Sequence, residues 1–424
     1  MVTMVDMIPV FLILFGVLAL NMPVYIALLS AGLYMQIVLN HMPLQGVVSA
    51  MFESVTKNSM LAIPFFILAG VFMSGGSLGE RLITMCSAFL RSMRAGMSMA
   101  CLLANALFGA ISGSPPAATA TFSKIMYEPL REQYGEKQAL GLIVGAAGLS
   151  SVIPPSVGMI IYGVVAEVSI ARLFMAGILP GLLLVLIIGI YLFTIGKSDK
   201  GFQKATREEK SKSLVRAIPV LILPVIILGG IYGGVFTPTE AGAVSAAYAA
   251  LVSIFVLKDM SFKKFLAVLK DGTITSAQVF ILLSCCGVFA QALTVTRVPL
   301  RLVDMFEGVH AVGFLIILNI ILLVFGCFFD SSAAILILVP LLTPTAMALG
   351  INPIHLGIVY VVNLTIGMFT PPFGLNLFVA QGVLQKELMS IAKAALPFVG
   401  LYLIGMVFIT YFPSISLLLP GIFM

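Results

Sequence analysis

Four sets of residues recur 217 positions further along the chain: Gly70-Val71-Phe72 as Gly287-Val288-Phe289, Gly96 as Gly313, Phe108-Gly109 as Phe325-Gly326, and Pro154-Pro155 as Pro371-Pro372. The register holds from Gly70 to Pro155 without a gap. A constant spacing of this kind indicates an internal structural repeat, so we expect two copies of one folding unit.

The composition places both copies in a membrane. Of the 424 residues, 60% are hydrophobic and 9% are charged, whereas an ordinary soluble domain has about 25% charged residues. We therefore predict an all-α polytopic membrane protein. Residues 1–6 lack the basic start of a secretory signal, so the first apolar run is predicted to be a membrane helix that is retained.

The distribution of basic residues predicts the orientation of the chain. Each copy contains five full crossings, an odd number, so the second copy is inverted relative to the first. The segment 197–216 holds seven Lys or Arg, and placing it in the cytoplasm leaves only four of the 23 basic residues outside: Lys57, Arg172, Arg297 and Arg301. We expect a multi-pass protein of a bacterial inner membrane with both termini in the periplasm.

The remaining composition excludes other classes of function. The net charge of +6 comes from loop residues that set orientation, so we expect no nucleic-acid partner. Five cysteines lie in apolar or amphipathic stretches without metal-type spacing and are predicted to be buried free thiols. Three scattered histidines give no metal or haem signal.

Four short polar or proline-containing breaks interrupt the apolar runs, at 112–116, 150–155, 330–332 and 367–372. Irregular backbone at membrane depth survives only where protein buries it or a polar cavity opens onto it. The first and third breaks are predicted tips of re-entrant hairpins, and the second and fourth interrupt full crossings. The first hairpin enters from the cytoplasm and the second, about 311–350, from outside, so the tips meet near the midplane.

A broken helix exposes carbonyls at one end and N–H groups at the other. Carbonyls and hydroxyls suit a small cation such as Na⁺, and helix N-termini suit a carboxylate. We predict two quasi-equivalent Na⁺ sites, each formed by a hairpin tip facing the broken crossing of its own half: Ser112, Gly113 and Ser114 with Ser150, Ser151 and Ser156, and Asp330, Ser331 and Ser332 with Gly367, Thr370 and Pro371. The predicted substrate-binding residues are Ser114, Pro154, Pro155, Ser332, Pro372 and Asn376.

Structural interpretations compete with these assignments. The paired prolines can be kinks, and Asp330, the one acid set deep within an apolar run, can be only the N-cap of the next helix. Asn376 can reach substrate or merely satisfy loose backbone. Thr237 to Glu240 match a helix-capping box, and Asn105 and Asn363 are expected to form hydrogen bonds between helices.

The breaks and their flanks resemble one known family, the large membrane subunit of tripartite ATP-independent periplasmic (TRAP) transporters. The resemblance covers essentially the whole chain and is carried by five motifs: Ala62-Ile63-Pro64-Phe65-Phe66, Ser112-Gly113-Ser114 through Ala120, Ile153-Pro154-Pro155-Ser156, Thr237-Pro238-Thr239-Glu240, and Thr370-Pro371-Pro372-Phe373-Gly374-Leu375-Asn376.

The resemblance implies a Na⁺-driven importer of organic acid anions such as a C4-dicarboxylate or sialic acid. It implies two partners, a periplasmic substrate-binding protein and a small four-helix membrane subunit, which we expect on a separate chain. It also implies an elevator mechanism with these parts: scaffold at 1–57 and 216–272, transport part at 58–196 and 273–424, and a cytoplasmic linker at 197–215.

Two other classes of function are compatible with parts of this sequence. The first is a passive channel or a stand-alone Na⁺/carboxylate symporter that needs no binding protein. The second is an intramembrane enzyme, but aspartyl proteolysis needs two acids at depth and the sequence offers one, while Ser-His chemistry lacks a buried histidine partner. We therefore expect a transporter subunit and not an enzyme.

Overall fold

The computed structural model describes residues 7–20, 22–196, 205–306 and 308–424, and within them every regular element is a helix. This agrees with the predicted fold class. Nine helices in the described part of the chain are long and apolar enough to cross a membrane. The predictions for residues 1–6 and for the basic segment 197–204 lie outside the described residues.

Twelve α- and π-helical elements and one 3₁₀ turn make up the first repeat: α1 (Ile8–Ala19), α2 (Val24–Leu33) with the π-helix η2 (Tyr34–Leu39), α3 (Leu44–Val55), the 3₁₀ turn η3 (Asn58–Leu61), α4 (Ala62–Gly75), α5 (Leu78–Leu90), α6 (Gly96–Ser112), α7 (Pro115–Tyr134), α8 (Glu136–Ala147), α9 (Leu149–Val152), α10 (Val157–Val165) and α11 (Ile170–Ile195). α1 and α2 pack as the antiparallel pair that their short connection requires.

The second repeat follows in the same order: α12 (Arg207–Pro224), η4 (Val225–Gly229), α13 (Gly230–Tyr232), α14 (Pro238–Leu251), η5 (Val252–Val256), α15 (Phe262–Val295), α16 (Val298–Met305), α17 (Ala311–Phe328), α18 (Ser331–Ala348), α19 (Pro353–Gly367), α20 (Leu375–Leu384), α21 (Leu388–Tyr411) and α22 (Ser414–Phe423). Residues 207–215, predicted to be linker, instead form the first turns of α12. Thr206 starts this helix with a capping box closed by Glu209.

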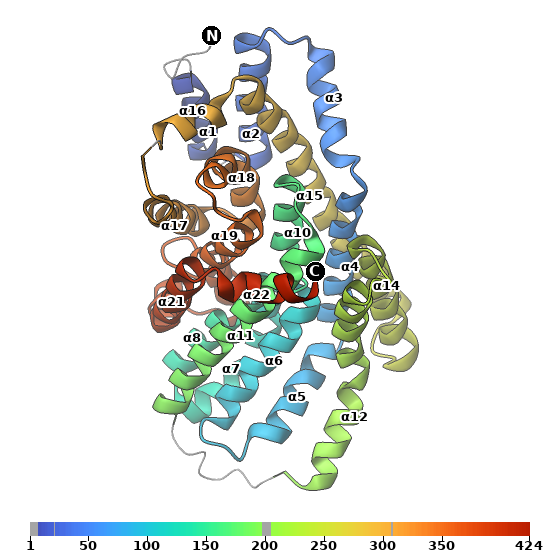
Figure 1. Ribbon diagram of the computed structural model, residues 1–424. Helices are drawn as coiled ribbons and strands as arrows, with labels where there is room; N and C mark the ends of the chain where they lie inside the picture. The colour runs from blue at the N-terminus through green and yellow to red at the C-terminus, as the bar shows by residue number, and fades with distance from the viewer. Residues whose placement is uncertain (1–6, 21, 197–204, 307) are drawn as a thin grey trace.

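The two copies are inverted relative to each other. The short amphipathic helices α5 and α16 occupy equivalent places in the repeats, and Figure 1 shows α5 toward one end of the molecule and α16 toward the other. Each leads directly into a hairpin, α6–α7 or α17–α18. The hairpins therefore enter the protein from opposite ends.

The hairpins interlock the two repeats. The first arm of each hairpin packs on the broken crossing of its own repeat, α6 on α8 and α9, and α17 on α19. The second arm also packs across, because α7 lies against α20 and α18 lies against α10. The helix after each break is thus held by the hairpin of the other repeat, a connection that the sequence did not predict.

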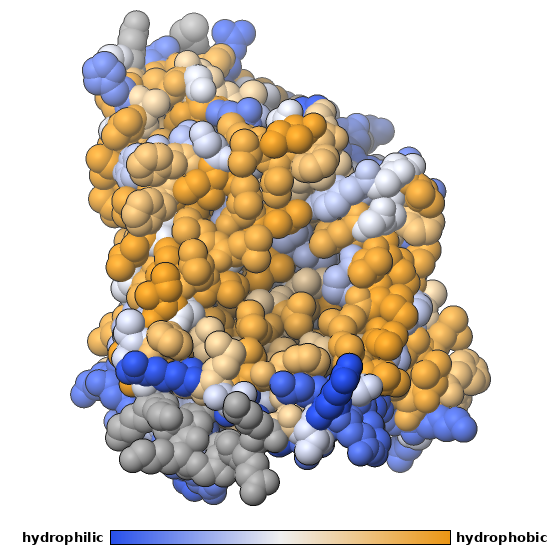
Figure 2. Space-filling model, turned by 60° about the horizontal axis from the view of Figure 1, so that its bottom comes forward, coloured by the Kyte–Doolittle hydropathy of each residue, from blue (hydrophilic) through white to orange (hydrophobic). Residues whose placement is uncertain are grey.

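Apolar side chains cover the outside of the bundle. Leu182, Leu186 and Ile190 follow one stripe of α11 at a spacing of four residues, and each is more than half exposed. Figure 2 shows apolar residues over most of one face, with hydrophilic residues gathered along its lower edge. An exposed apolar surface of this extent is that of a protein surrounded by lipid.

The smaller sequence predictions have different outcomes. Thr237 and Glu240 form the expected capping box of α14. Asn363 on α19 donates to Asn319 Oδ1 on α17 at 2.9 Å, as an interhelical hydrogen bond should. The prediction for Asn105 was wrong, because its Nδ2 donates to the Cys101 carbonyl one turn earlier in the same helix. All five cysteines are free, four are buried and Cys327 is half-buried.

Candidate functional site

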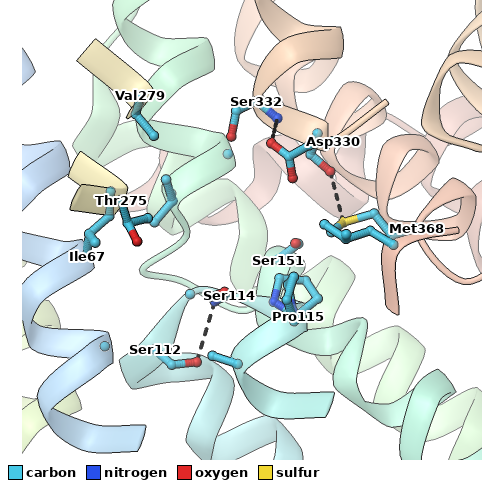
Figure 3. Close-up of a pocket in the computed structure, with 18 of the residues that line it drawn as sticks. Ile67, Ser112, Ser114, Pro115, Ser151, Thr275, Val279, Asp330, Ser332 and Met368 are labelled. Carbon is cyan, nitrogen blue, oxygen red and sulfur yellow. Dashed lines mark hydrogen bonds between the residues drawn. The ribbon is translucent and has the colours of Figure 1, made fainter. Parts of the chain in front are cut away.

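A cavity of about 530 Å³ lies between the two hairpin tips. The tips and the two broken crossings form one side, and α4 and α15 form the other (Figure 3). The tips approach each other as expected from inverted repeats. Residues from both halves of the chain therefore line the cavity.

The first hairpin tip is a tight reversal between α6 and α7. Gly113 ends α6 with a φ of +57°, a conformation that favours glycine. A Cβ at Gly113 would stand 2.8 Å from the carbonyl oxygen of Pro155, so this glycine also permits close contact with the break in α8–α10. The Ser114 N–H points at Ser112 Oγ, 3.4 Å away.

The break in the first repeat begins later than predicted. Ser150 and Ser151 still belong to the helical turn α9, and the irregular segment runs from Ile153 to Ser156 with a cis Pro154–Pro155 peptide. Proline has no N–H, so the carbonyls of Ser150 and Ser151 lose the donors that a continuing helix would supply. Ser150 Oγ is buried and has no hydrogen-bond partner.

The second hairpin tip is ordered by Asp330. Its carboxylate accepts a hydrogen bond of 2.9 Å from the Ser332 N–H, which makes it the N-cap of α18. Its role as a cation ligand stays a prediction. The side chain is nevertheless exposed to the cavity. Ser331 Oγ donates to Met368 Sδ at 3.1 Å, which ties the tip to the break after α19.

The backbone of the second break has more hydrogen-bond partners than that of the first. It runs from Met368 to Gly374 and also contains a cis proline pair, Pro371–Pro372. Here the Asn376 N–H donates to the Met368 carbonyl at 2.8 Å, and Thr370 Oγ1 donates to the Ile366 carbonyl at 2.6 Å. The two predicted cation sites are therefore not equivalent in their hydrogen bonding.

The structure brings only part of the predicted set to the cavity: Ser112, Gly113, Ser114, Ser151, Asp330, Ser331 and Ser332. The other predicted residues lie outside its lining: Ser150, Pro154, Pro155, Ser156, Gly367, Thr370, Pro371, Pro372 and Asn376.

Packing explains several of these positions. Ser150 lies behind the tip against Gly109, and Ser156 Oγ caps α10 by accepting from the Met159 N–H. Asn376 is fully buried with no partner for either side-chain amide atom, so the suggestion that its side chain satisfies loose backbone was wrong, although its main-chain N–H does so.

Sequence reasoning missed the α15 side of the cavity. Thr275, Gln278 and Val279 of this long unbroken helix line it, together with Ile67 and Val71 of α4. Thr275 and Gln278 are polar residues spaced by three, which places them on one helix face. That spacing was the available signal.

Four helix N-termini open into the cavity. The first residues of α7, α10, α18 and α20 all line it. Helix N-termini carry N–H groups without helical partners and partial positive charge, although the two prolines that start α7 reduce its share of donors. One N–H at each of the other three starts is already bonded: that of Met159, Ser332 or Asn376. Among the described residues that line the cavity, Asp330 is the one charged side chain.

Two inverted repeats whose hairpin tips and broken helices enclose one shared cavity are the architecture of secondary transporters. Comparison with known sequences agrees. The sequence model of the family described as "Tripartite ATP-independent periplasmic transporter, DctM component" matches residues 11–415. The chain belongs to this family of TRAP transporter large permeases, as its motifs predicted, and it is a transporter component and not an enzyme.

Named relatives span several substrates. The chain is 41% identical to the C4-dicarboxylate TRAP transporter large permease protein of Pseudomonas aeruginosa over 88% of each chain. It is 33% identical to the sialic acid TRAP transporter large permease protein of Vibrio cholerae, covering 96% of this chain and 97% of the relative. It is also 37% identical to the isethionate TRAP transporter permease protein DctMQ of Oleidesulfovibrio alaskensis, covering 98% of this chain and 67% of that protein.

A solved structure shares the fold. The YdaH transporter of Alcanivorax borkumensis superposes with a TM-score of 0.59 over 89% of this chain and 90% of the other, at 15% sequence identity. At that identity the similarity concerns the fold alone.

Proposed function

We propose that this chain is the large membrane subunit of a Na⁺-coupled importer of an organic acid anion. The observation that carries the proposal is the convergence of four helix N-termini on one cavity between the hairpin tips. Such ends bind anions through their free N–H groups and their dipoles. No basic side chain is present among the described lining residues, so the backbone would supply the attraction.

The charge of the cavity supports coupling to a cation. An organic anion would enter a site that already holds the Asp330 carboxylate, and two like charges at membrane depth repel each other strongly. A bound Na⁺ would remove this repulsion. The carbonyls of Ser150 and Ser151, which lack helical donors, and the unpartnered Ser150 hydroxyl are the best placed oxygen ligands of the first repeat.

Three of the relatives are named for a C4-dicarboxylate, a sialic acid and isethionate, all organic anions. We propose an organic acid as the substrate, with C4-dicarboxylates as the first to be tested because the relative named for them is 41% identical. Backbone N–H groups recognise any small oxyanion, so the cavity itself selects a charge class and leaves finer selection to a delivering protein.

The partners follow from the family name, which describes one component of a tripartite transporter. We propose a periplasmic substrate-binding protein and a small membrane subunit on a separate chain, in a bacterial inner membrane with both termini in the periplasm. The transport part would move as an elevator against α1–α3 and α12–α14. The interlocking of α7 with α20 and of α10 with α18 supports this proposal, because it makes the two hairpins and both breaks one body.

Uptake into proteoliposomes tests the proposal. The full chain is reconstituted with the small membrane subunit and the binding protein from the same genome, and labelled C4-dicarboxylates and sialic acid are supplied under an inward Na⁺ gradient or an equal K⁺ gradient. We expect uptake that requires Na⁺ and the binding protein. Uptake that persists without the binding protein would support a stand-alone symporter, and equal uptake under K⁺ would overturn Na⁺ coupling.

A further inference from the structure

A second cavity, of about 500 Å³, lies away from the hairpin tips between α5, α7 and α12. We name it the α5–α12 cleft. Its apolar lining, which we call the floor, consists of Ile83, Ala88, Met97, Ile125, Met126 and Pro129. Its charged lining, which we call the rim, consists of Arg91, Glu209, Lys212 and Arg216.

The cleft lies at the edge of the apolar belt. Lys212 and Arg216 are one turn apart on α12, and the apolar part of this helix begins immediately after them at Ala217. Arg91 directly follows the last residue of α5. Figure 1 shows the last turn of α5 and the first turn of α12 at the end of the molecule opposite α16. This is the depth at which lipid headgroups meet basic side chains.

Two guanidinium groups in the cleft have unused hydrogen-bonding capacity. Arg91 Nη2 bonds Glu209 Oε2 at 2.6 Å, but Arg91 Nε is buried without a partner. The Arg216 side chain has no ion-pair or hydrogen-bond partner among the described residues; only its carbonyl is used, by Arg81 Nη1. Lys212, in contrast, is paired with Glu208.

A neighbouring arginine, Arg94, has a structural role in contrast to Arg91 and Arg216. Its side chain binds the C-terminal end of α11, where Nε donates to the Gly196 carbonyl at 2.7 Å and Nη2 donates to the Thr194 carbonyl at 2.9 Å. It caps a helix and needs no further ligand. Arg91 and Arg216 therefore differ from a basic residue of purely structural role at the same edge.

We propose that the α5–α12 cleft binds an anionic phospholipid, with the phosphate between Arg91 and Arg216 and an acyl chain on the apolar floor. Because Arg91 is paired with Glu209 and Lys212 with Glu208, Arg216 leaves one positive charge uncompensated, which complements a single negative headgroup. A free phosphate or a soluble acid would leave the apolar floor exposed to water, whereas a lipid covers it. The cleft joins α5, which leads into the first hairpin, to α12 of the second repeat.

Fluorescence quenching tests the proposal on the full chain. The sequence contains no tryptophan, so Met93→Trp, two residues after Arg91 at a side chain that is 45% exposed, supplies a single reporter. The protein is reconstituted in phosphatidylcholine with increasing brominated phosphatidylglycerol, and the quenching gives a relative binding constant. We expect phosphatidylglycerol to be preferred over brominated phosphatidylcholine.

Two further variants locate the lipid. Arg91→Gln with Arg216→Gln should lower the preference for phosphatidylglycerol roughly 25-fold, since each basic residue near a headgroup contributes about fivefold. Ala88→Phe keeps every charge and fills the floor, and it should also weaken binding. The matched control, Lys263→Gln with Lys264→Gln, removes the same charge from exposed positions at the start of α15 and should change little.

The outcomes separate the alternatives. Unchanged quenching in the Arg91/Arg216 variant, measured on protein with the parental unfolding temperature, overturns the proposal. Displacement of the lipid by soluble glycerol phosphate at constant ionic strength shows a free phosphate site and also overturns it. If the Arg91/Arg216 variant does not fold, Ala88→Phe decides, because retained phosphatidylglycerol preference with a filled floor contradicts the assignment.

Discussion

Gly109 lies so close to Ser150 that a Cβ on the glycine would stand 2.7 Å from the serine Cα. The contact recurs 217 positions later, where a Cβ on Gly326 would stand 3.1 Å from the Cα of Gly367. Both contacts join the first arm of a hairpin to the broken crossing of its own repeat. They fix the distance between each tip and its break.

These close contacts predict that a methyl group added at either glycine lowers the stability of the fold. Gly109→Ala and Gly326→Ala should each lower the free energy of unfolding by about 1–3 kcal/mol, because backbone atoms must move apart to admit the Cβ. Unfolding of the detergent-solubilised protein by heat or denaturant measures the change. Gly400→Ala is the control, since no atom outside its own stretch of helix lies within 4 Å of its new Cβ. Equal stability of the three variants would contradict the close contact.

The two possible roles of Asp330 can be separated by two substitutions. Asp330→Ala removes the acceptor of the Ser332 N–H and should cost about 0.5–2 kcal/mol of stability, as loss of an N-cap does. Asp330→Asn keeps an oxygen acceptor and removes the charge, so it should retain stability while Na⁺-dependent uptake is lost. A Na⁺ titration of uptake and an unfolding curve give both readouts. Parental Na⁺ dependence in Asp330→Asn would leave this residue a cap and nothing more.

The ion pair between Lys57 and Glu167 predicts a pH dependence. Lys57 Nζ donates to Glu167 Oε1 at 2.6 Å, which lowers the pKa of this carboxyl group. A lowered folded-state pKa means that the contribution to stability is present above the unfolded-state pKa, near 4.3, and is lost as the pH falls through the lower folded-state value. Both side chains are largely exposed, so the effect is small and decreases with salt.

Thermal unfolding of the parent and of Glu167→Gln between about pH 6 and pH 3 tests this. The difference between their midpoints should shrink toward acid pH. Glu132→Gln is the control, because Glu132 is exposed and has no hydrogen bond or ion pair among the described residues. A difference that grows toward acid pH would contradict the sign of the pKa shift.

The proposed orientation predicts which introduced cysteines a reagent outside the cell can label. A cysteine at Ser211 should be shielded from a membrane-impermeant thiol reagent outside intact cells, and a cysteine at His310 should react. Both positions are exposed, whereas four native cysteines are buried and Cys327 is half-buried, so background labelling should be low. Labelling at Ser211 together with protection at His310 would reverse the topology.

The sequence predicted the parts of the fold that depend on local chemistry. The prolines at 154, 155, 371 and 372 and the small polar tips mark the breaks, because helical hydrogen bonding fails where the N–H is missing. The constant spacing predicted the repeat, and the odd number of crossings in each copy predicted its inversion. The start of α12 at Arg207 was missed, although Thr206 and Glu209 form a recognisable capping box, because the basic residues there were interpreted as a loop.

The sequence could not predict which surfaces face the cavity. Thr275 Oγ1 donates to the Asp271 carbonyl within α15, so locally it is an ordinary helical threonine; only packing of α15 opposite the tips exposes it to the site. The different hydrogen bonding of the two breaks also depends on how the chain folds back. The Asn376 N–H donates to the carbonyl of Met368, which lies eight residues earlier in the chain.

The exchange of hairpin arms between repeats has an evolutionary consequence. The second arm of each hairpin, α7 or α18, rests on a helix of the other repeat, and the cavity is lined from both. Half of this chain could complete neither the packing nor the site by itself. A half-length ancestor would have had to insert in both orientations and pair as an antiparallel homodimer, and gene duplication with fusion would make that pairing permanent and let each half diverge.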